Sequence, residues 1–167
     1  MSGEIQSGRK TIDDRRKEID DAIATFTDSL GIPRKCANVD LAKEYISTTR
    51  DELNTLSREE CLNRAFILSQ HSFNIQLQYN TENARVKWAN TLLGKIASNV
   101  DYGNGKWVNF EEKKLKAAIN DDAAGRLLDI KNYAEARMTH LEFLASSLNN
   151  MVNTLKELAK VKGEKNG

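Results

Sequence analysis

Residues 127–159, LLDIKNYAEARMTHLEFLASSLNNMVNTLKELA, decide the fold of this chain. Glycine and proline are absent from the stretch. An apolar residue recurs at every seventh position, at Leu127, Ala134, Leu141, Leu148 and Leu155. Most of these residues are followed by a further apolar residue three or four positions later. An apolar stripe held over about five heptads is typical of a helix that packs along its whole length against another helix. The stretch therefore predicts one long helix with a helical partner.

Composition narrows the class of protein. The chain has 167 residues, of which 40% are hydrophobic and 29% charged, and its single proline favours helix throughout. Its net charge of +1 gives no overall preference for nucleic acid, so such a preference needs a local patch. The sequence has no apolar run long enough to cross a bilayer and no signal-peptide pattern, and it has two cysteines. We therefore expect a cytoplasmic protein with no membrane partner.

The N-terminal third is expected to form two shorter helices. Residues 1–10 are small and polar, and we expect them to be disordered. Thr11 is a candidate N-cap for the first helix, and Gly31 is a candidate for its end. A second helix is expected at about residues 40–55. We treat residues 11–56 as an N-terminal helical arm.

A capping box starts the third helix. In Ser57-Arg58-Glu59-Glu60, the serine and the second glutamate can each satisfy the free backbone N–H of the other. We expect one helix from residue 58 to about 98, followed by a glycine-containing turn at about 99–109. Two long helices joined by a short loop pack antiparallel within one chain. The prediction is an all-α fold: a long antiparallel, coiled-coil-like helical hairpin over residues 57–160, two shorter N-terminal helices and a disordered tail at 161–167.

The segment after the turn leaves one alternative open. Asn109 is a candidate N-cap for a helix that runs to about Asn120, and Asp121-Asp122 either restarts the helix or lies within it. A thin hairpin buries little surface, so we also expect a homo-oligomer that forms through the apolar stripe. The candidate oligomerisation residues are Leu127, Leu141, Leu144, Leu148, Met151 and Leu155.

Enzyme motifs are weak, and we expect no catalytic residue, no cofactor and no metal. The segment Gly103-Asn104-Gly105-Lys106 shares only its composition with a phosphate-binding loop, because the glycine spacing is wrong. His71 and His140 lack the Glu-x-x-His spacing of di-iron bundles. Together with Cys36 and Cys61 they give no pair with the spacing of zinc ligands.

Cations and aromatic rings cluster around the predicted turn, where acidic residues are few. Cations that follow a phosphate backbone, with rings on which bases stack, suit sequence-tolerant binding of single strands. The alternative is that Trp88 packs inside the hairpin, Trp107 and Phe110 plug its end, and the lysines form a solvated face. The candidate nucleic-acid-binding residues are Arg85, Lys87, Lys95, Tyr102, Lys106, Trp107, Lys113 and Lys114.

The layout of residues 62–160 resembles the phage recombination mediators of the UvsY type. A long helix ends in an Asp101-Tyr102-Gly103 turn, and a lysine-rich segment, the pair Asp121-Asp122 and a leucine-striped helix follow. The resemblance implies a small helical oligomer that binds single-stranded DNA and loads a recombinase onto strands covered by single-strand-binding protein. It places the family's basic-aromatic stretch on Arg85, Lys87, Lys95, Tyr102, Lys106 and Trp107. The chain lacks the family's arginine after the turn glycine, and residues 1–56 have no clear counterpart.

These observations predict a non-enzymatic recombination mediator whose partners are single-stranded DNA, a recombinase, a single-strand-binding protein and further copies of the chain. The alternative is a helical oligomeric assembly protein, adaptor or virion scaffold protein without nucleic-acid binding. The near-neutral charge favours the alternative. The clustering of cations and tryptophans near the turn favours the first prediction.

Overall fold

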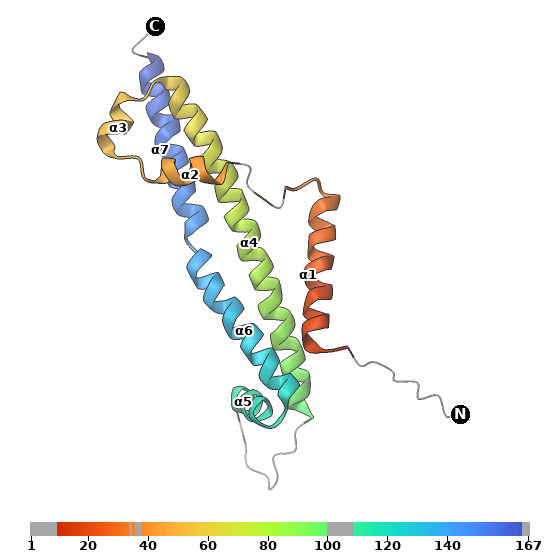
Figure 1. The fold of residues 1–167 in the computed structure, drawn as a ribbon. Coiled ribbons are helices and arrows are strands. Elements are labelled where there is room, and N and C mark those ends of the chain that lie inside the picture. The colour runs from red at the N-terminus through yellow and green to blue at the C-terminus, as the bar shows by residue number, and fades with distance from the viewer. Residues whose placement is uncertain (1–9, 34, 36–37, 100–108, 165–167) are drawn as a thin grey trace. The chain divides into compact units, whose positions relative to one another are not determined.

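The computed structural model describes residues 10–33, 35, 38–99 and 109–164, and within these ranges it holds seven α-helices and no strand. The prediction of an all-α fold is therefore confirmed. Figure 1 labels the helices in chain order. Their bounds are α1 (Ile12–Ser29), α2 (Val39–Ile46), α3 (Arg50–Thr55), α4 (Arg58–Ser98), α5 (Phe110–Asn120), α6 (Asp122–Leu141) and α7 (Leu144–Glu164).

The capping box predicted at the start of α4 is present. The Ser57 hydroxyl oxygen accepts from the Glu60 backbone N–H at 3.2 Å, and the Ser57 N–H donates to the Glu60 carboxylate at 2.6 Å. These hydrogen bonds lower the pKa of Glu60. Thr11 caps α1 in the same way, and Gly31 follows the end of α1 with a φ of 68°. Only glycine adopts that left-handed backbone conformation without a steric cost.

The single helix predicted at residues 40–55 is wrong, because the structure has two helices there. α2 ends at Ile46 and α3 begins at Arg50. Thr49 forms a second capping box, in which its hydroxyl oxygen accepts from the Glu52 N–H and its own N–H donates to the Glu52 carboxylate. A residue that caps a new helix adopts an extended backbone, here with ψ of 163°, so the helix is interrupted at this point.

The continuous helix predicted over residues 127–159 is also divided. α6 ends at Leu141 and α7 begins at Leu144, so Glu142 and Phe143 lie in a turn between them. No glycine or proline marks this break. The preceding residues Thr139 and His140 have lower helix propensity than the leucine, alanine and arginine around them, which weakens the helix locally.

α5 and α6 are separate helices joined at Asp121. This residue has an extended backbone at the end of α5, and its carboxylate accepts the Ala124 N–H at 2.7 Å at the start of α6. The sequence left open whether Asp121-Asp122 restarts the helix or lies within it, and the structure shows that the helix restarts there. Gly125 permits the close approach of the two helices, because a Cβ atom there would lie 3.0 Å from the Ala118 carbonyl oxygen.

The contacts divide the chain into two compact units. Unit 1 comprises residues 1–30 and 83–135, and unit 2 comprises residues 31–82 and 136–167. α4 contributes its first part to unit 2 and its second part to unit 1. The contacts thus group α1 with the second part of α4, whereas the sequence predicts a single N-terminal arm over residues 11–56.

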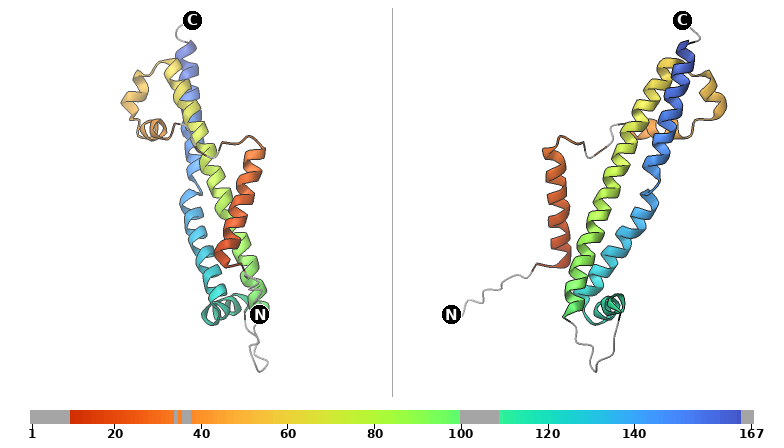
Figure 2. Two further views of the ribbon diagram at one scale, coloured as in Figure 1. Left: turned by 45° about the vertical axis from the view of Figure 1, so that its right-hand side comes forward. Right: turned by 180° about the vertical axis from the view of Figure 1, so that it is seen from behind.

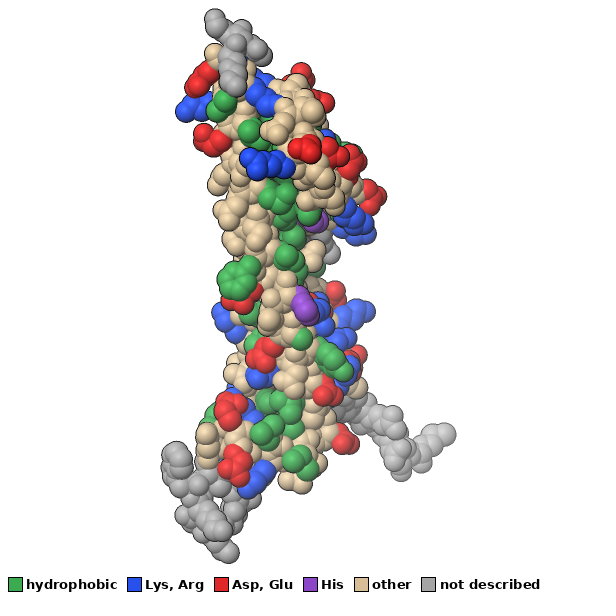
Figure 3. Space-filling view, turned by 90° about the vertical axis from the view of Figure 1, so that its left-hand side faces the viewer, with side chains coloured by type: hydrophobic (Ala, Val, Ile, Leu, Met, Phe, Trp, Pro, Cys, Tyr) green, Lys and Arg blue, Asp and Glu red, His purple; other side chains and the backbone are tan. Residues whose placement is uncertain are grey.

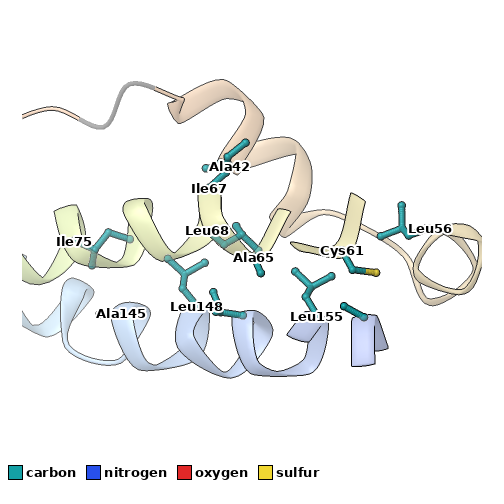
Figure 4. Close-up of a cluster of buried hydrophobic side chains, with 12 residues drawn as sticks. Ala42, Leu56, Cys61, Ala65, Ile67, Leu68, Ile75, Ala145, Leu148 and Leu155 are labelled. Atoms are coloured by element: carbon teal, nitrogen blue, oxygen red, sulfur yellow. The ribbon is translucent and has the colours of Figure 1, made fainter. Parts of the chain in front are cut away.

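The core of unit 2 lies between the first part of α4 and α7, which run side by side in Figures 1 and 2. The Ser72 hydroxyl donates to the Ala145 carbonyl at 2.9 Å, and the Lys162 ammonium donates to the Asn54 carbonyl before α4. These pairings establish an antiparallel arrangement. In the close-up of Figure 4, side chains of α4 and α7 face one another and Ala42 of α2 lies beside α4. The buried set includes Cys61, Ala65, Leu68, Leu148, Val152, Leu155 and Ala159.

Unit 1 has a smaller core, built mainly from alanine. The second part of α4 lies beside α6 in Figure 1. Small side chains let helices approach closely, and the larger Leu93 and Leu127 fill the space between them. Trp88 is half-buried and packs against this core. The buried residues are Ala89, Leu93, Ala97, Ala117, Ala124, Leu127 and Ile130.

We expect Leu148→Ala to lower the free energy of unfolding by about 2–5 kcal/mol, since truncation of a buried leucine leaves a cavity. Leu148 is 5% exposed in the core of unit 2. Leu144→Ala on the same helix is the matched control, because Leu144 is 46% exposed and should cost much less. Urea unfolding followed by circular dichroism measures both. Equal losses would contradict the assignment of the α4–α7 core.

Candidate nucleic-acid interface

Five of the eight predicted nucleic-acid-binding residues lie in the described part of the chain, all in unit 1. Arg85, Lys87 and Lys95 belong to α4, and Lys113 and Lys114 belong to α5. The other three, Tyr102, Lys106 and Trp107, lie outside the described residues, as do residues 100–108 of the turn predicted at about 99–109.

Lys87 and Lys95 are the predicted cations that remain available for a ligand. Both are exposed, and neither ammonium group has a hydrogen bond or ion pair with another described residue. They are eight residues apart on α4, which is about 12 Å along the helix axis. Thr91, also exposed, lies between them on the same side. We call Lys87, Thr91 and Lys95 the lysine strip.

No acidic residue occurs in α4 between Glu82 and the end of the helix. The second part of α4 is therefore charged only by Arg85, Lys87 and Lys95. Counter-charges from the same helix do not weaken the positive potential of the lysine strip, since residues three or four positions away are neutral. This local excess of positive charge is present although the whole chain is nearly neutral.

Arg85 is engaged within the fold. Its Nε atom donates to the Asp20 carboxylate of α1 at 2.8 Å, and both side chains are about three-quarters buried. A partly buried arginine–carboxylate pair of this kind holds α1 against α4 in unit 1. A phosphate would have to displace Asp20 before it reached Arg85.

Lys114 is also engaged, and it is buried rather than exposed. Its ammonium donates to the Asn90 side-chain oxygen of α4 at 2.9 Å and to the Glu111 carboxylate at 2.6 Å, and it lies 4.9 Å from the centre of the Phe110 ring. The hydrogen bond from Lys114 lowers the pKa of Glu111. These contacts give Lys114 a structural role in joining α5 to α4.

Lys113 is half-buried, and its side chain takes part in an interaction within the chain. Together with Arg85 and Lys114, it is one of the predicted cations that the fold itself uses. Trp88 likewise packs against the unit 1 core, in agreement with the alternative that placed it inside the hairpin. The described part of the predicted interface is thus reduced to the lysine strip.

The structure places most of the predicted oligomerisation residues inside the chain's own cores. Leu127, Leu148 and Leu155 are at most 5% exposed. Leu141 and Met151 are half-buried and pack against the unit 2 core, whereas Leu144 is exposed. The predicted homo-oligomer therefore needs another surface.

Two contacts that hold α1 in unit 1 were not found by sequence reasoning. Arg126 of α6 makes two hydrogen bonds to the Asp13 carboxylate, at 3.1 and 2.9 Å, and Arg85 pairs with Asp20. Each pair joins residues far apart in the chain, so no local pattern indicates it. The hydrogen bond from Arg126 lowers the pKa of Asp13, and the same pairing raises the pKa of Arg126.

The described residues contain no group of three or more His, Cys, Asp or Glu side chains placed to hold a metal ion. Among the helices described, none combines the length and the apolar character that a membrane span requires. On the face shown in Figure 3, acidic and basic side chains are interspersed with hydrophobic ones. That face therefore does not present a field of a single sign.

Comparison of the chain with protein-family models, with curated proteins and with solved structures finds no match. The resemblance to UvsY-type mediators remains a prediction.

We expect Lys114→Ala to lower the free energy of unfolding by about 1–3 kcal/mol, because it removes charge-assisted hydrogen bonds and leaves Asn90 without its donor. Lys116→Ala is the matched control on the same helix. Lys116 is about half exposed and pairs with Glu112 at the surface, so its loss should change stability by less than about 0.5 kcal/mol. Urea unfolding measures both variants. An unchanged stability for Lys114→Ala would contradict its structural role.

The Asp13–Arg126 pair should make stability depend on pH. Because folding depresses the pKa of Asp13 below its ordinary value of 3.8, the pair stabilises the protein above that pH and is lost as the pH falls through the lower folded-state value. Asp13→Asn should therefore melt at a lower temperature at neutral pH and lose less on acidification. Thermal melts of both proteins across this range test it. Parallel profiles would show that the pair contributes nothing.

Proposed function

We propose that the protein binds single-stranded DNA through the lysine strip of α4 and acts as a non-enzymatic recombination mediator that helps to load a recombinase. One observation carries the proposal: Lys87 and Lys95 are exposed and unpaired among the described residues, on a helix segment that has no acidic residue. Free ammonium groups in a regular row are suited to phosphate oxygens, because they follow the backbone without reading the bases.

The sequence supports single strands over duplexes as the ligand. Tyr102 and Trp107 lie a few residues beyond the end of α4 in a segment that also carries Lys106. Aromatic rings stack on unpaired bases, whereas the bases of a duplex already stack on one another. We therefore propose that phosphates contact the lysine strip and bases stack on rings from residues 100–108.

The mediator role rests on the resemblance of residues 62–160 to UvsY-type proteins. In that family, the mediator binds single-stranded DNA and brings the recombinase to strands covered by single-strand-binding protein. A recombinase and a single-strand-binding protein are thus the proposed protein partners. Weak, sequence-tolerant binding fits this role, because the mediator has to release the strand once the recombinase is loaded.

A second candidate function is that of a helical assembly protein or adaptor without nucleic-acid binding. The observation that favours it is an exposed apolar stripe on α4 in unit 2, where Leu62, Phe66 and Phe73 are 46%, 61% and 49% exposed. Contiguous exposed apolar side chains of this size commonly mark a protein–protein contact. The two functions are compatible, since the stripe and the lysine strip lie on different parts of α4.

The decisive measurement is the fluorescence anisotropy of a labelled single-stranded oligonucleotide, titrated with protein at a series of salt concentrations. Each phosphate neutralised contributes about −0.7 to the slope of log affinity against log salt. The double variant Lys87→Gln, Lys95→Gln should therefore bind more weakly, with a slope shallower by about 1.4 for two lost contacts. Trp107→Ala should weaken binding without changing the slope, because stacking depends little on salt.

The matched control is Lys156→Gln, Lys160→Gln on α7, which removes the same charge from two exposed lysines in unit 2. The control should retain the wild-type affinity and slope. If both double variants lose affinity equally, binding reflects net charge and the lysine strip is not a site. If the wild-type protein shows no salt-sensitive binding at low ionic strength, the adaptor function is the better conclusion.

A further inference from the structure

One face of α4 in unit 2 is apolar and is left exposed by the described part of the chain. Leu62, Phe66, Ser69 and Phe73 follow one another at intervals of four, three and four residues, which places them in a row on one side of the helix. All four are exposed. The α7-facing side of the same helix carries the buried residues Cys61, Ala65, Leu68 and Ser72, so the two rows lie on different sides. We call the exposed row the phenylalanine stripe.

The phenylalanine stripe borders a groove that has Pro33 and Lys35 on its other wall. The groove is open to solvent, and the empty space inside it is about 730 Å³. Phe66, Ser69, Gln70 and Phe73 of α4 line it. A helix laid along the stripe would therefore contact α4 and the segment before α2.

Three of the four stripe residues, Phe66, Ser69 and Phe73, lie in the longest uncharged run of the described helices. Residues 65–81 of α4 contain no Asp, Glu, Lys or Arg, in a chain of which 29% of residues are charged. Protein–protein interfaces are marked by this combination, in which charged residues are depleted at the centre and aromatic residues are enriched. A solvated surface of an ordinary helix does not need either feature.

A polar atom beside the stripe also lacks a partner. The Oε1 atom of Gln70 is buried and has no hydrogen bond with another described residue. A buried acceptor without a donor costs free energy. Gln70 is itself half-buried and lines the groove.

We propose that the phenylalanine stripe is a homodimer interface in which α4 of a second copy packs antiparallel on it, about a twofold axis between Ser69 and Gln70. In this register residue n faces residue 139 − n, so Phe66 faces Phe73 of the second copy and Leu62 faces Leu77. Ser69 faces Gln70 of the second copy, which places two polar residues at the twofold axis. A twofold interface needs such a self-complementary pattern.

The distribution of charge along α4 favours a second copy of α4 as the partner and an antiparallel direction for the pair. The uncharged span lets two identical faces meet without contact between like charges. A parallel pair would bring Glu59 and Glu60 at the start of α4 beside their own copies, whereas the antiparallel register places them over the uncharged residues 79 and 80. Antiparallel packing also opposes the two helix dipoles favourably.

The dimer should be weak. The contact from Leu62 to Leu77 covers about 22 Å of helix, and an interface of one helix pair is smaller than the about 800 Å² per partner of a standard stable complex. Sedimentation velocity of the full chain over a wide concentration range should therefore show a monomer–dimer equilibrium. Phe66→Glu should shift this equilibrium to monomer throughout the range, because it brings two carboxylates into the apolar contact of each dimer.

Phe143→Glu is the matched control for this variant. Phe143 is 71% exposed and also belongs to unit 2, but it lies in the turn between α6 and α7. The control should dimerise like the wild type, and circular dichroism melts should show that both variants are folded. A wild-type chain that is monomeric at all concentrations, or a dimer that Phe143→Glu dissociates and Phe66→Glu does not, would overturn the proposal.

Cross-linking tests the register without depending on the stability of a charged variant. In a Cys36→Ser background, where the remaining native thiol, Cys61, is buried, Ser69→Cys should be joined to its copy by a short bis-maleimide. Leu62→Cys should not be cross-linked to its copy, because residue 62 faces residue 77 and the two introduced thiols are about 22 Å apart. Cross-linking of both variants would indicate a parallel pair, and cross-linking of neither would exclude this interface.

Discussion

The packing of α4 is the constraint on which the rest of the structure depends. Its first part supplies the buried face opposite α7, and its second part supplies the alanine-rich face opposite α6. One 41-residue helix therefore serves as the partner for both halves of the C-terminal leucine stripe. Because this packing buries Leu127, Leu148 and Leu155 inside the chain, these leucines are not available for contact with another molecule.

Ion pairing within the fold determines which cations remain for a ligand. Arg85 pairs with Asp20, Arg126 pairs with Asp13, and Arg137 pairs with Glu82 at 2.9 Å. Arginine forms such pairs well because its planar guanidinium can bind a carboxylate through several N–H groups, whereas exposed lysines lose more side-chain entropy on pairing. In the second part of α4, the exposed positive charge is thus carried by Lys87 and Lys95, while Arg85 is used by the fold.

The sequence predicted those features that local interactions determine. The capping box located the start of α4 at residue 58, and the same pattern, Thr49 to Glu52, would have located the start of α3 had it been applied there. The break after Leu141 has no comparable local pattern. The roles of Arg85 and Lys114 were inaccessible for a different reason, because their partners Asp20 and Asn90 lie 65 and 24 residues away in the chain. A count of cations within a window of sequence therefore included residues that the fold itself uses.

The two surfaces that α4 retains are each too small to act alone. Two lysines neutralise about two phosphates, which gives little affinity at physiological ionic strength. The phenylalanine stripe is likewise too short for a tight dimer. In the proposed dimer each copy would bring its own lysine strip. A strand long enough to reach both strips would make its second contact intramolecularly, and its overall affinity would rise without any new kind of contact. By linkage, such a strand would stabilise the proposed dimer by the same factor. The two proposals together therefore predict that DNA binding and self-association are coupled.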